Sequence, residues 1–158
     1  MSQQHNKIGR NERFDVERSI RYRVALLSRL WTTSTEHIYI DQFGISLSEW
    51  RILAIVAAAQ PVYANAIVER GILEKSRVSR IVARLVERQL IETSPDDEDS
   101  RRNLLQLTEE GARMHDALAD LSRKRDELFE RALSKREKAE FDRMISKLLN
   151  WSFTVTGK

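Results

Sequence analysis

Four arginines between positions 77 and 88 recur at helical spacing and could bind an anionic partner. On a wheel of 3.6 residues per turn they fall within an arc of about 80°, and an apolar face is centred about 100° away. The arginines are Arg77, Arg80, Arg84 and Arg88, and the apolar residues are Val78, Ile81, Val82 and Leu85. A planar guanidinium binds phosphate or the edge of guanine through two hydrogen bonds. The pattern therefore indicates a helix that packs by one face and presents a basic row on the next.

This helix concentrates the positive charge of the chain. Positions 75–88 hold five basic residues and one acidic residue, a local net charge of +4. The 27 Lys and Arg and 24 Asp and Glu of the whole chain give only +3. A helix fits the major groove of B-DNA, and Ser76 and Ser79 near its start are placed to reach phosphates or base edges. Taken alone, the stripe fits a solvated basic face equally well.

The elements predicted around the basic helix follow the order of a winged helix-turn-helix, in which the third helix enters the groove. Ser46 and Glu49 form a capping box that opens a short buried helix. The predicted elements are that helix as far as Gln60-Pro61, a short helix at 65–70, the basic helix at about 75–89, and strands at 90–94 and 103–107. This context favours DNA over the solvated face.

Arg101 and Arg102 end the loop between the two predicted strands. Arginine is favoured in a narrow minor groove because the negative potential is enhanced there. The acidic run at 96–99 would repel DNA at the same tip, so the alternative is that Arg101 pairs with these acids. Both interpretations hold if Asp99 orients the Arg101 side chain while the end of its guanidinium group faces DNA.

Long amphipathic helices are predicted on both sides of the winged helix. The apolar residues of the first helix are Ile20, Val24, Leu27, Trp31 and Ile38. The next helix is capped by Thr108, and its apolar residues are Met114, Leu118, Leu121, Leu128 and Phe129. The last helix is opened by a capping box of Ser134 and Glu137, and we expect Phe141, Ile145, Leu148 and Leu149 to point inward. A winged helix cannot cover these faces alone, so we expect two chains to pair around a twofold axis. For the tail aromatics Trp151 and Phe153, the alternative is that they fold back on the first helix.

The sequence therefore predicts a mainly α fold with a small β-ribbon, a winged helix-turn-helix flanked by long dimerisation helices. Glycine and proline total 7 residues, where average usage would give about 19. We expect a flexible N-terminal arm at 1–12, a winged helix-turn-helix DNA-binding domain at 45–107, and a helical dimerisation region formed by 13–44 and 108–158.

Several classes of protein are excluded. The longest apolar run, 52–59, is too short for a membrane span, and the polar N-terminus resembles no secretory signal. Cysteine is absent, which fits a cytoplasmic protein. His5, His37 and His115 are scattered, and no phosphate-binding glycine loop or nucleophile motif occurs. We expect no enzyme activity, no catalytic or metal-binding residues, no cofactor and no membrane partner.

The run LEKSRVSRIVARLVERQLI, followed by DSRRNLLQLTEEG, resembles the MarR family of bacterial winged-helix regulators. The matching features are Ser76-x-Val78-Ser79-Arg80, Asp99-x-Arg101 and Leu107-Thr108-x-x-Gly111. By this resemblance, Ser76, Arg77, Ser79, Arg80 and Arg84 would face the major groove or its phosphates, and Arg101 the minor groove. Gln89 departs from the family, which more often has glycine between the recognition helix and the wing.

The resemblance also implies a homodimer and a small-molecule effector that enters between the dimer helices and the winged helix. His37, Tyr39 and Trp50 are the candidate pocket residues, with Trp31 also near the junction. For Trp31 and Trp50 an ordinary core position is the stronger interpretation.

The predicted function is sequence-specific binding of double-stranded DNA by a homodimeric transcriptional repressor, released from a pseudo-palindromic operator by a small ligand. An aromatic ligand is one that the resemblance allows. The alternative is a winged-helix protein-interaction module, whose docking face would carry apolar anchors where this chain has arginines. Binding of RNA or a membrane by the segment Lys7 to Arg29, with seven basic and three acidic residues, also stays open.

Overall fold

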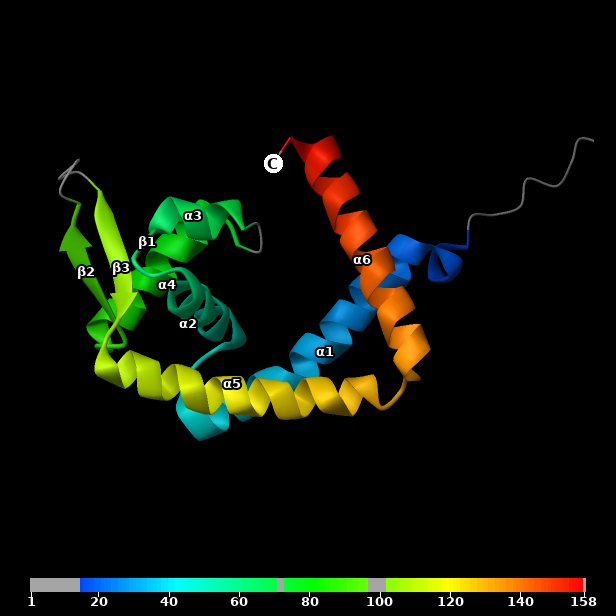
Figure 1. Ribbon diagram of the computed structural model, residues 1–158, viewed down its shortest axis with the longest axis horizontal. Helices are drawn as coiled ribbons and strands as arrows, with labels where there is room; N and C mark the ends of the chain where they lie inside the picture. Colours follow the sequence, from blue (N-terminus) through cyan, green and yellow to red (C-terminus); the bar gives the residue numbers. More distant parts are fainter. Residues whose placement is uncertain (1–14, 71–72, 97–101, 158) are drawn as a thin grey trace, which may run out of the picture.

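The computed structural model describes residues 15–70, 73–96 and 102–157. A 3₁₀ helix, η1 (Val16–Arg18), leads into the long α1 (Ile20–Phe43). The next elements are α2 (Leu47–Ala59), β1 (Val62–Tyr63), α3 (Ala64–Glu69), α4 (Lys75–Glu87), β2 (Ile91–Pro95) and β3 (Asn103–Leu107). Two long helices, α5 (Glu109–Glu130) and α6 (Lys135–Thr156), complete the chain. This order confirms the predicted class, mainly α with a small β-ribbon (Figure 1).

The two capping boxes that the sequence predicts are present in the structure. Gly44 ends α1 in the left-handed conformation at φ 61°, and Ser46 and Glu49 form the capping box of α2. Ser134 and Glu137 form the second capping box, at the start of α6, and the hydrogen bonds from Ser134 hold the pKa of the Glu137 carboxyl below its ordinary value. These caps satisfy backbone N–H groups that the helices leave unpaired.

The sheet contains one strand that the sequence did not predict. β1 pairs with β3, so the antiparallel order is β1-β3-β2, with Val62 opposite Leu105 and Thr93 opposite Leu105 on the other side. A strand of two residues is too short to show alternation. It follows directly after Pro61, where the sequence indicated only the end of a helix.

The buried core lies almost wholly within the winged helix. Leu53 and Val56 of α2, Leu85 of α4 and Leu105 of β3 are at most 2% exposed, and Leu118 of α5 joins the same cluster. The helices α2, α3 and α4 pack together beside the sheet, and the first half of α5 runs beneath α2 (Figure 1). This unit therefore closes its own core within one chain.

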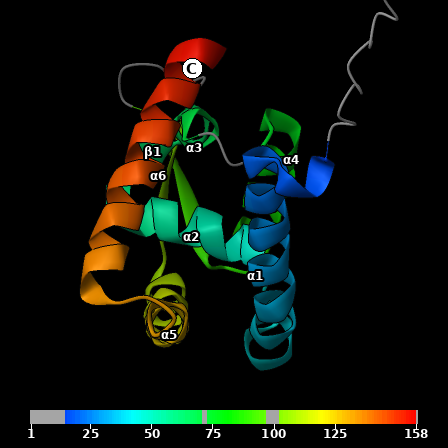
Figure 2. The same cartoon turned by 90° about the vertical axis from the view of Figure 1, so that its right-hand side faces the viewer.

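The long helices α1 and α6 do not close a core. In Figure 2 they stand on opposite sides of the molecule, and α6 contains no buried residue. The expectation that Phe141, Leu148 and Leu149 point inward is wrong for the single chain, since they are 36–52% exposed, whereas Ile145 is partly buried as expected. The alternative of a tail folded back on the first helix is not what the structure shows, because Trp151 is 63% exposed.

Candidate nucleic-acid interface

The helix α4 is seated on the core by a narrow apolar face. Val78, Ile81 and Leu85 are at most 4% exposed, and they pack in the same cluster as α2 and the sheet. The apolar side chains are therefore located as the helical spacing predicts. The opposite side of α4 is free to meet a partner.

Ser76, Ser79 and Arg80 form the outward face of α4. All three are exposed, and among the described residues the Arg80 side chain bonds only within its own helix, from Nε to the Ser76 carbonyl at 3.4 Å. A guanidinium held this lightly is free to reorient toward a phosphate or a base edge. We call Ser76, Ser79 and Arg80 the outward face below.

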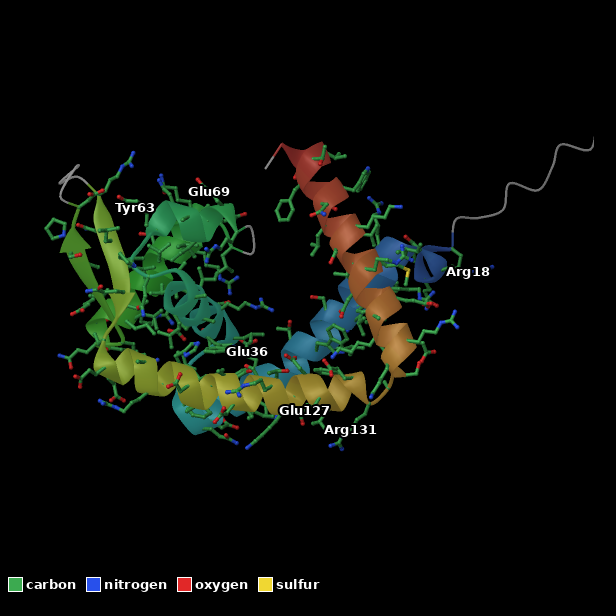
Figure 3. The ribbon with its side chains drawn as sticks, viewed as in Figure 1. Arg18, Glu36, Tyr63, Glu69, Glu127 and Arg131 are labelled. Atoms are coloured by element: carbon green, nitrogen blue, oxygen red, sulfur yellow. The ribbon has the colours of Figure 1, made fainter. Side chains whose placement is uncertain are left out.

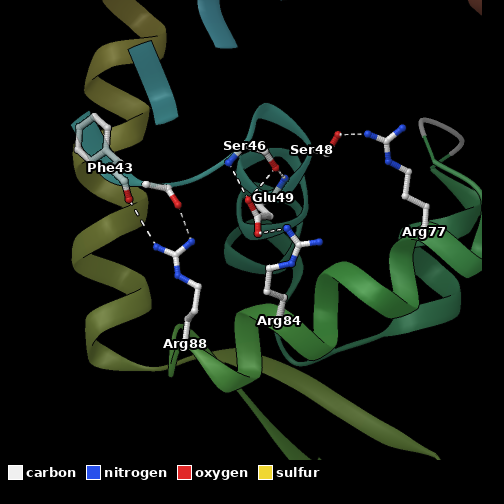
Figure 4. A network of polar contacts seen from close by, with 8 residues as sticks. Phe43, Ser46, Ser48, Glu49, Arg77, Arg84 and Arg88 are labelled. Atoms are coloured by element: carbon white, nitrogen blue, oxygen red, sulfur yellow. Dashed lines mark hydrogen bonds and ion pairs between the residues drawn. The ribbon is translucent and has the colours of Figure 1, made fainter. Parts of the chain in front are cut away.

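The other three arginines of the stripe contact the protein itself. Arg77 Nη2 donates to Ser48 Oγ at 3.0 Å, and Arg88 Nη1 donates to the Gly44 carbonyl at 2.8 Å (Figure 4). Arg84 Nη1 lies 3.3 Å from Glu49 Oε1. The sequence placed the four arginines on one face, but the structure divides them between an outward position and a flank turned to α2.

Glu49 is a functional candidate that the sequence predicted only as part of the helix cap of α2. It is 3% exposed, and its Oε2 accepts hydrogen bonds from the backbone N and the Oγ of Ser46, each at 2.7 Å. Its Oε1 is buried without a hydrogen bond, beside Arg84. The available signal was a glutamate in the first turn of a mostly apolar helix, but its partner on α4 is not visible in the spacing.

At the wing, the structure describes only one of the two predicted arginines. Arg101 and the acids at 97–99 lie outside the described residues. Arg102 is exposed, with its guanidinium carbon 5.7 Å from the centre of the Tyr63 ring, a cation–π distance. Tyr63 donates from its hydroxyl to Asp96, and it is labelled beside the strands in Figure 3. Tyr63 of β1 thus contacts residues just after β2 and just before β3.

The turn from α4 to the wing depends on a close backbone approach. Gln89 has φ 57°, so the position that the family resemblance associates with glycine does adopt the left-handed conformation here. Thr108 Oγ donates to the Gln89 carbonyl at 2.6 Å and accepts from Gly111 N at 2.9 Å. A Cβ on Gly111 would lie 1.9 Å from the Leu90 carbonyl oxygen, so only glycine fits without movement.

A cavity of about 820 Å³ lies between the long helices and the start of α2. Its aromatic wall includes Trp31 and Tyr39 of α1, Trp50 of α2 and Phe129 of α5. The Trp31 and Phe129 rings are 5.0 Å apart, and Tyr39 Oη and Ser122 Oγ share a hydrogen bond of 2.8 Å. The size and the apolar lining with a few polar groups are typical of a small-molecule site.

Two of the three predicted pocket residues border this cavity. Tyr39 and Trp50 line it while also belonging to the core cluster. His37 is exposed and is not among the lining residues, so the structure does not bring it to the cavity. His115 was not predicted, but its ring lies 5.5 Å from that of Trp50.

Over the ranges that the structure describes, no group of three or more His, Cys, Asp or Glu side chains is placed to hold a metal ion. Within the same ranges, no helix is long and apolar enough to cross a membrane.

Comparison with known proteins places the chain among regulators. The family model described as MarR family matches residues 43–102, from the end of α1 to the wing. The chain is 25% identical over 123 residues to the HTH-type transcriptional repressor IacR of Pseudomonas putida, covering 78% of this chain and 71% of that protein. It is 31% identical over 78 residues to the HTH-type transcriptional repressor NicR of a Pseudomonas putida strain, about half of each chain (49%).

A solved structure extends this likeness to the long helices. The crystal structure of a MarR/EmrR family transcriptional regulator from Acinetobacter sp. ADP1 superposes with a TM-score of 0.82 at 26% identity, covering 89% of this chain and 99% of that one. The fold and the matching family model are those of transcriptional regulators, which are not enzymes. The winged helix, the flanking helices and the family match agree, and the chain is similar to the MarR family of winged-helix transcriptional regulators.

Proposed function

We propose that this regulator is a homodimeric repressor that binds a pseudo-palindromic operator in double-stranded DNA. The observation that carries the proposal is the outward face of α4, where Ser76, Ser79 and Arg80 are exposed on a helix seated firmly by its apolar side. A protruding helix with hydrogen-bonding side chains near its start is the element that reads the major groove in helix-turn-helix proteins.

Basic side chains around this face supply contacts to the DNA backbone. Arg77 is exposed beside Ser76, and Arg102 is exposed at the wing. We assign both to phosphates, and Arg101 to the adjacent minor groove. Arg84 lies on the same flank as Arg77, but its charge is already opposite Glu49. Both curated relatives are named transcriptional repressors, which supports repression as the outcome of binding.

Exposed apolar faces on the terminal helices support a dimer. Ile20 and Leu30 of α1 are 71% and 53% exposed, and Trp151 and Val155 of α6 are each 63% exposed. Many large apolar side chains exposed along a helix favour an interface with a partner. We propose that a second copy of the chain covers these apolar side chains. Residues 13–44 and 108–158 would then form the dimerisation region, and residues 45–107 the DNA-binding domain. Two copies of α4 would then read two half-sites about one DNA turn apart.

The cavity supports release by a small ligand. It is lined both by the long helices and by α2, so an occupant would touch the proposed dimerisation region and the proposed DNA-binding domain together. The rings of Trp31, Trp50 and Phe129 suit an aromatic ligand. Such a ligand causes release of DNA if it binds the DNA-free conformation of the protein more tightly than the DNA-bound one.

The test is a fluorescence-anisotropy titration with the duplex from immediately upstream of the regulator's own gene. A scrambled duplex of the same composition serves as the control. We expect at least about a thousandfold preference for the upstream duplex, the usual lower bound for specific binding. We also expect a steep fall in affinity with rising salt, because counterions are released from the phosphates.

The alternative function, a winged helix that binds only proteins, makes the opposite prediction. In that case both duplexes would bind equally weakly, with little dependence on salt. The arginine flank and the polar outward face of α4 argue against it, because protein-docking faces are centred on apolar anchors.

A further inference from the structure

The arginines of α4 occupy two different positions on the helix. On a helical wheel, Arg77, Arg84 and Arg88 lie within about 40° of one another, on the flank that faces α2. Arg80 lies about 40° or more beyond them, roughly 150° from the centre of the apolar face. The contacts follow this division, since the three flank arginines bond to other elements and Arg80 bonds within α4.

One contact of the flank joins a buried carboxylate to Arg84. Glu49 is 3% exposed, and the Arg84 side chain, 57% exposed, approaches its Oε1 at 3.3 Å. No hydrogen bond reaches Oε1 in the described residues, so the guanidinium charge is its main compensation. A buried charge that loses its only partner is strongly destabilising.

Arg88 provides a second attachment one turn further along α4. It donates to the Gly44 carbonyl at 2.8 Å and to the Phe43 carbonyl at 3.5 Å. These carbonyls belong to the last turn and C-cap of α1, the negative end of that helix dipole, which favours a cation. Figure 4 shows both arginines reaching from α4 to the α1–α2 turn and the first turn of α2.

We propose that Glu49, Arg84 and Arg88 form a clamp that positions α4, and that Arg84 is a positioning residue rather than a DNA contact. The inference rests on the proposed DNA binding by the outward face. Arg84 keeps its charge opposite Glu49 when DNA is bound, and the clamp sets the angle at which Ser79 and Arg80 meet the base edges. Sequence discrimination then depends on a carboxylate that never touches DNA.

The experiment is a double-mutant cycle of Glu49→Gln and Arg84→Gln in the full chain. Anisotropy titrations on the upstream and scrambled duplexes are repeated at several salt concentrations. Gln is accepted at this position of a capping box, so Glu49→Gln retains the start of α2. Arg113→Gln is the matched control, because Arg113 is an exposed arginine paired with Glu110 on α5. Circular dichroism checks that each variant is folded.

We expect each single substitution to weaken binding to the upstream duplex about tenfold, within the range of coupling between contacting residues. The double variant should lose little more than either single variant, because each substitution alone already breaks the contact between Glu49 and Arg84. The slope of log affinity against log salt should stay at the wild-type value. Arg113→Gln should behave as the wild type.

Two results would overturn the clamp. One is a slope for Arg84→Gln that is shallower by about 0.9, the signature of a lost phosphate contact. The other is Glu49→Gln binding as tightly as the wild type or more tightly, which would mean that Glu49 only withholds Arg84 from DNA. Urea unfolding of the wild type, the two single variants and the double variant measures the Glu49–Arg84 coupling without DNA. Additive changes in their unfolding free energies would also contradict the clamp. A wild type with no preference for the upstream duplex would instead refute the proposed function.

Discussion

The winged helix and the terminal helices of this protein both carry apolar side chains at helical spacing, but only the winged helix buries most of them within one chain. Leu53 of α2 is fully buried within its own chain, whereas Leu149 of α6 is 52% exposed. The winged helix closes its core with short helices and a sheet, and α1 and α6 present apolar faces to solvent. Amphipathic spacing therefore predicts which face of a helix is apolar, but not whether the same chain or a second one covers that face.

The largest expected effect is on assembly. Ending the chain before Leu148 removes Leu148, Leu149, Trp151 and Phe153 from the proposed interface. Burial of each large apolar side chain contributes about 1.5–3 kcal/mol when complete. We therefore expect the dimer dissociation constant to rise at least about a hundredfold. Sedimentation velocity over a concentration series measures this, and a shortened chain that sediments as an intact dimer contradicts the assigned interface.

The same substitution made in the two regions should have different consequences. Leu53→Ala leaves a cavity in a closed core and should lower the free energy of unfolding by about 2–5 kcal/mol at every protein concentration. Leu149→Ala should destabilise only the paired chains, so the free energy of unfolding that it removes should depend on protein concentration. Urea unfolding at two protein concentrations distinguishes the two variants. Equal losses of unfolding free energy that do not change with protein concentration would contradict the distinction between the regions.

Gly111 tests how closely α5 is attached to the winged helix. A Cβ there would lie 1.9 Å from the Leu90 carbonyl oxygen, so Gly111→Ala must push the helix away from the turn before β2. We expect a loss of about 1–3 kcal/mol in unfolding free energy, as for other overpacked sites. Arg113→Ala, exposed on the same helix, is the control. A Gly111→Ala protein as stable as the wild type would show that this close approach is not required.

The smallest expected effect has the opposite sign. Gln89 adopts φ 57°, which glycine accepts more readily than any other residue. Gln89→Gly should raise the free energy of unfolding by a few tenths to about 1 kcal/mol, with the gain in backbone fit partly offset by entropy. A shift in the urea midpoint measures it. Destabilisation by this change would indicate that the Gln89 side chain has a role in the wing turn.

Local signals in the sequence predicted most of the fold. The capping residues Ser46, Thr108 and Ser134 mark helix starts correctly, and the apolar spacing in α4 selects the buried face. β1 was missed because two residues carry no periodicity. The inward orientation expected for α6 was wrong for one chain, since periodicity does not distinguish a core from an interface.

The candidate site was predictable to the level of the helix, but not of the individual arginine. Spacing placed Arg80 and Arg84 on one basic face, and only the packing of α2 against α4 shows that Arg84 meets Glu49. Likewise, His37 was selected for its side-chain chemistry, and its exposed position on α1 was beyond what the pattern reveals. Contacts between distant segments require the tertiary structure.

The most direct test of the account is operator binding by Arg80→Ala. Arg80 is exposed on the outward face of a helix that the core and the proposed clamp hold in place. If α4 reads the major groove, this change should weaken binding to the upstream duplex by about 1–3 kcal/mol while binding to the scrambled duplex changes far less. Unchanged affinity for the upstream duplex would contradict the central claim that α4 is the recognition helix.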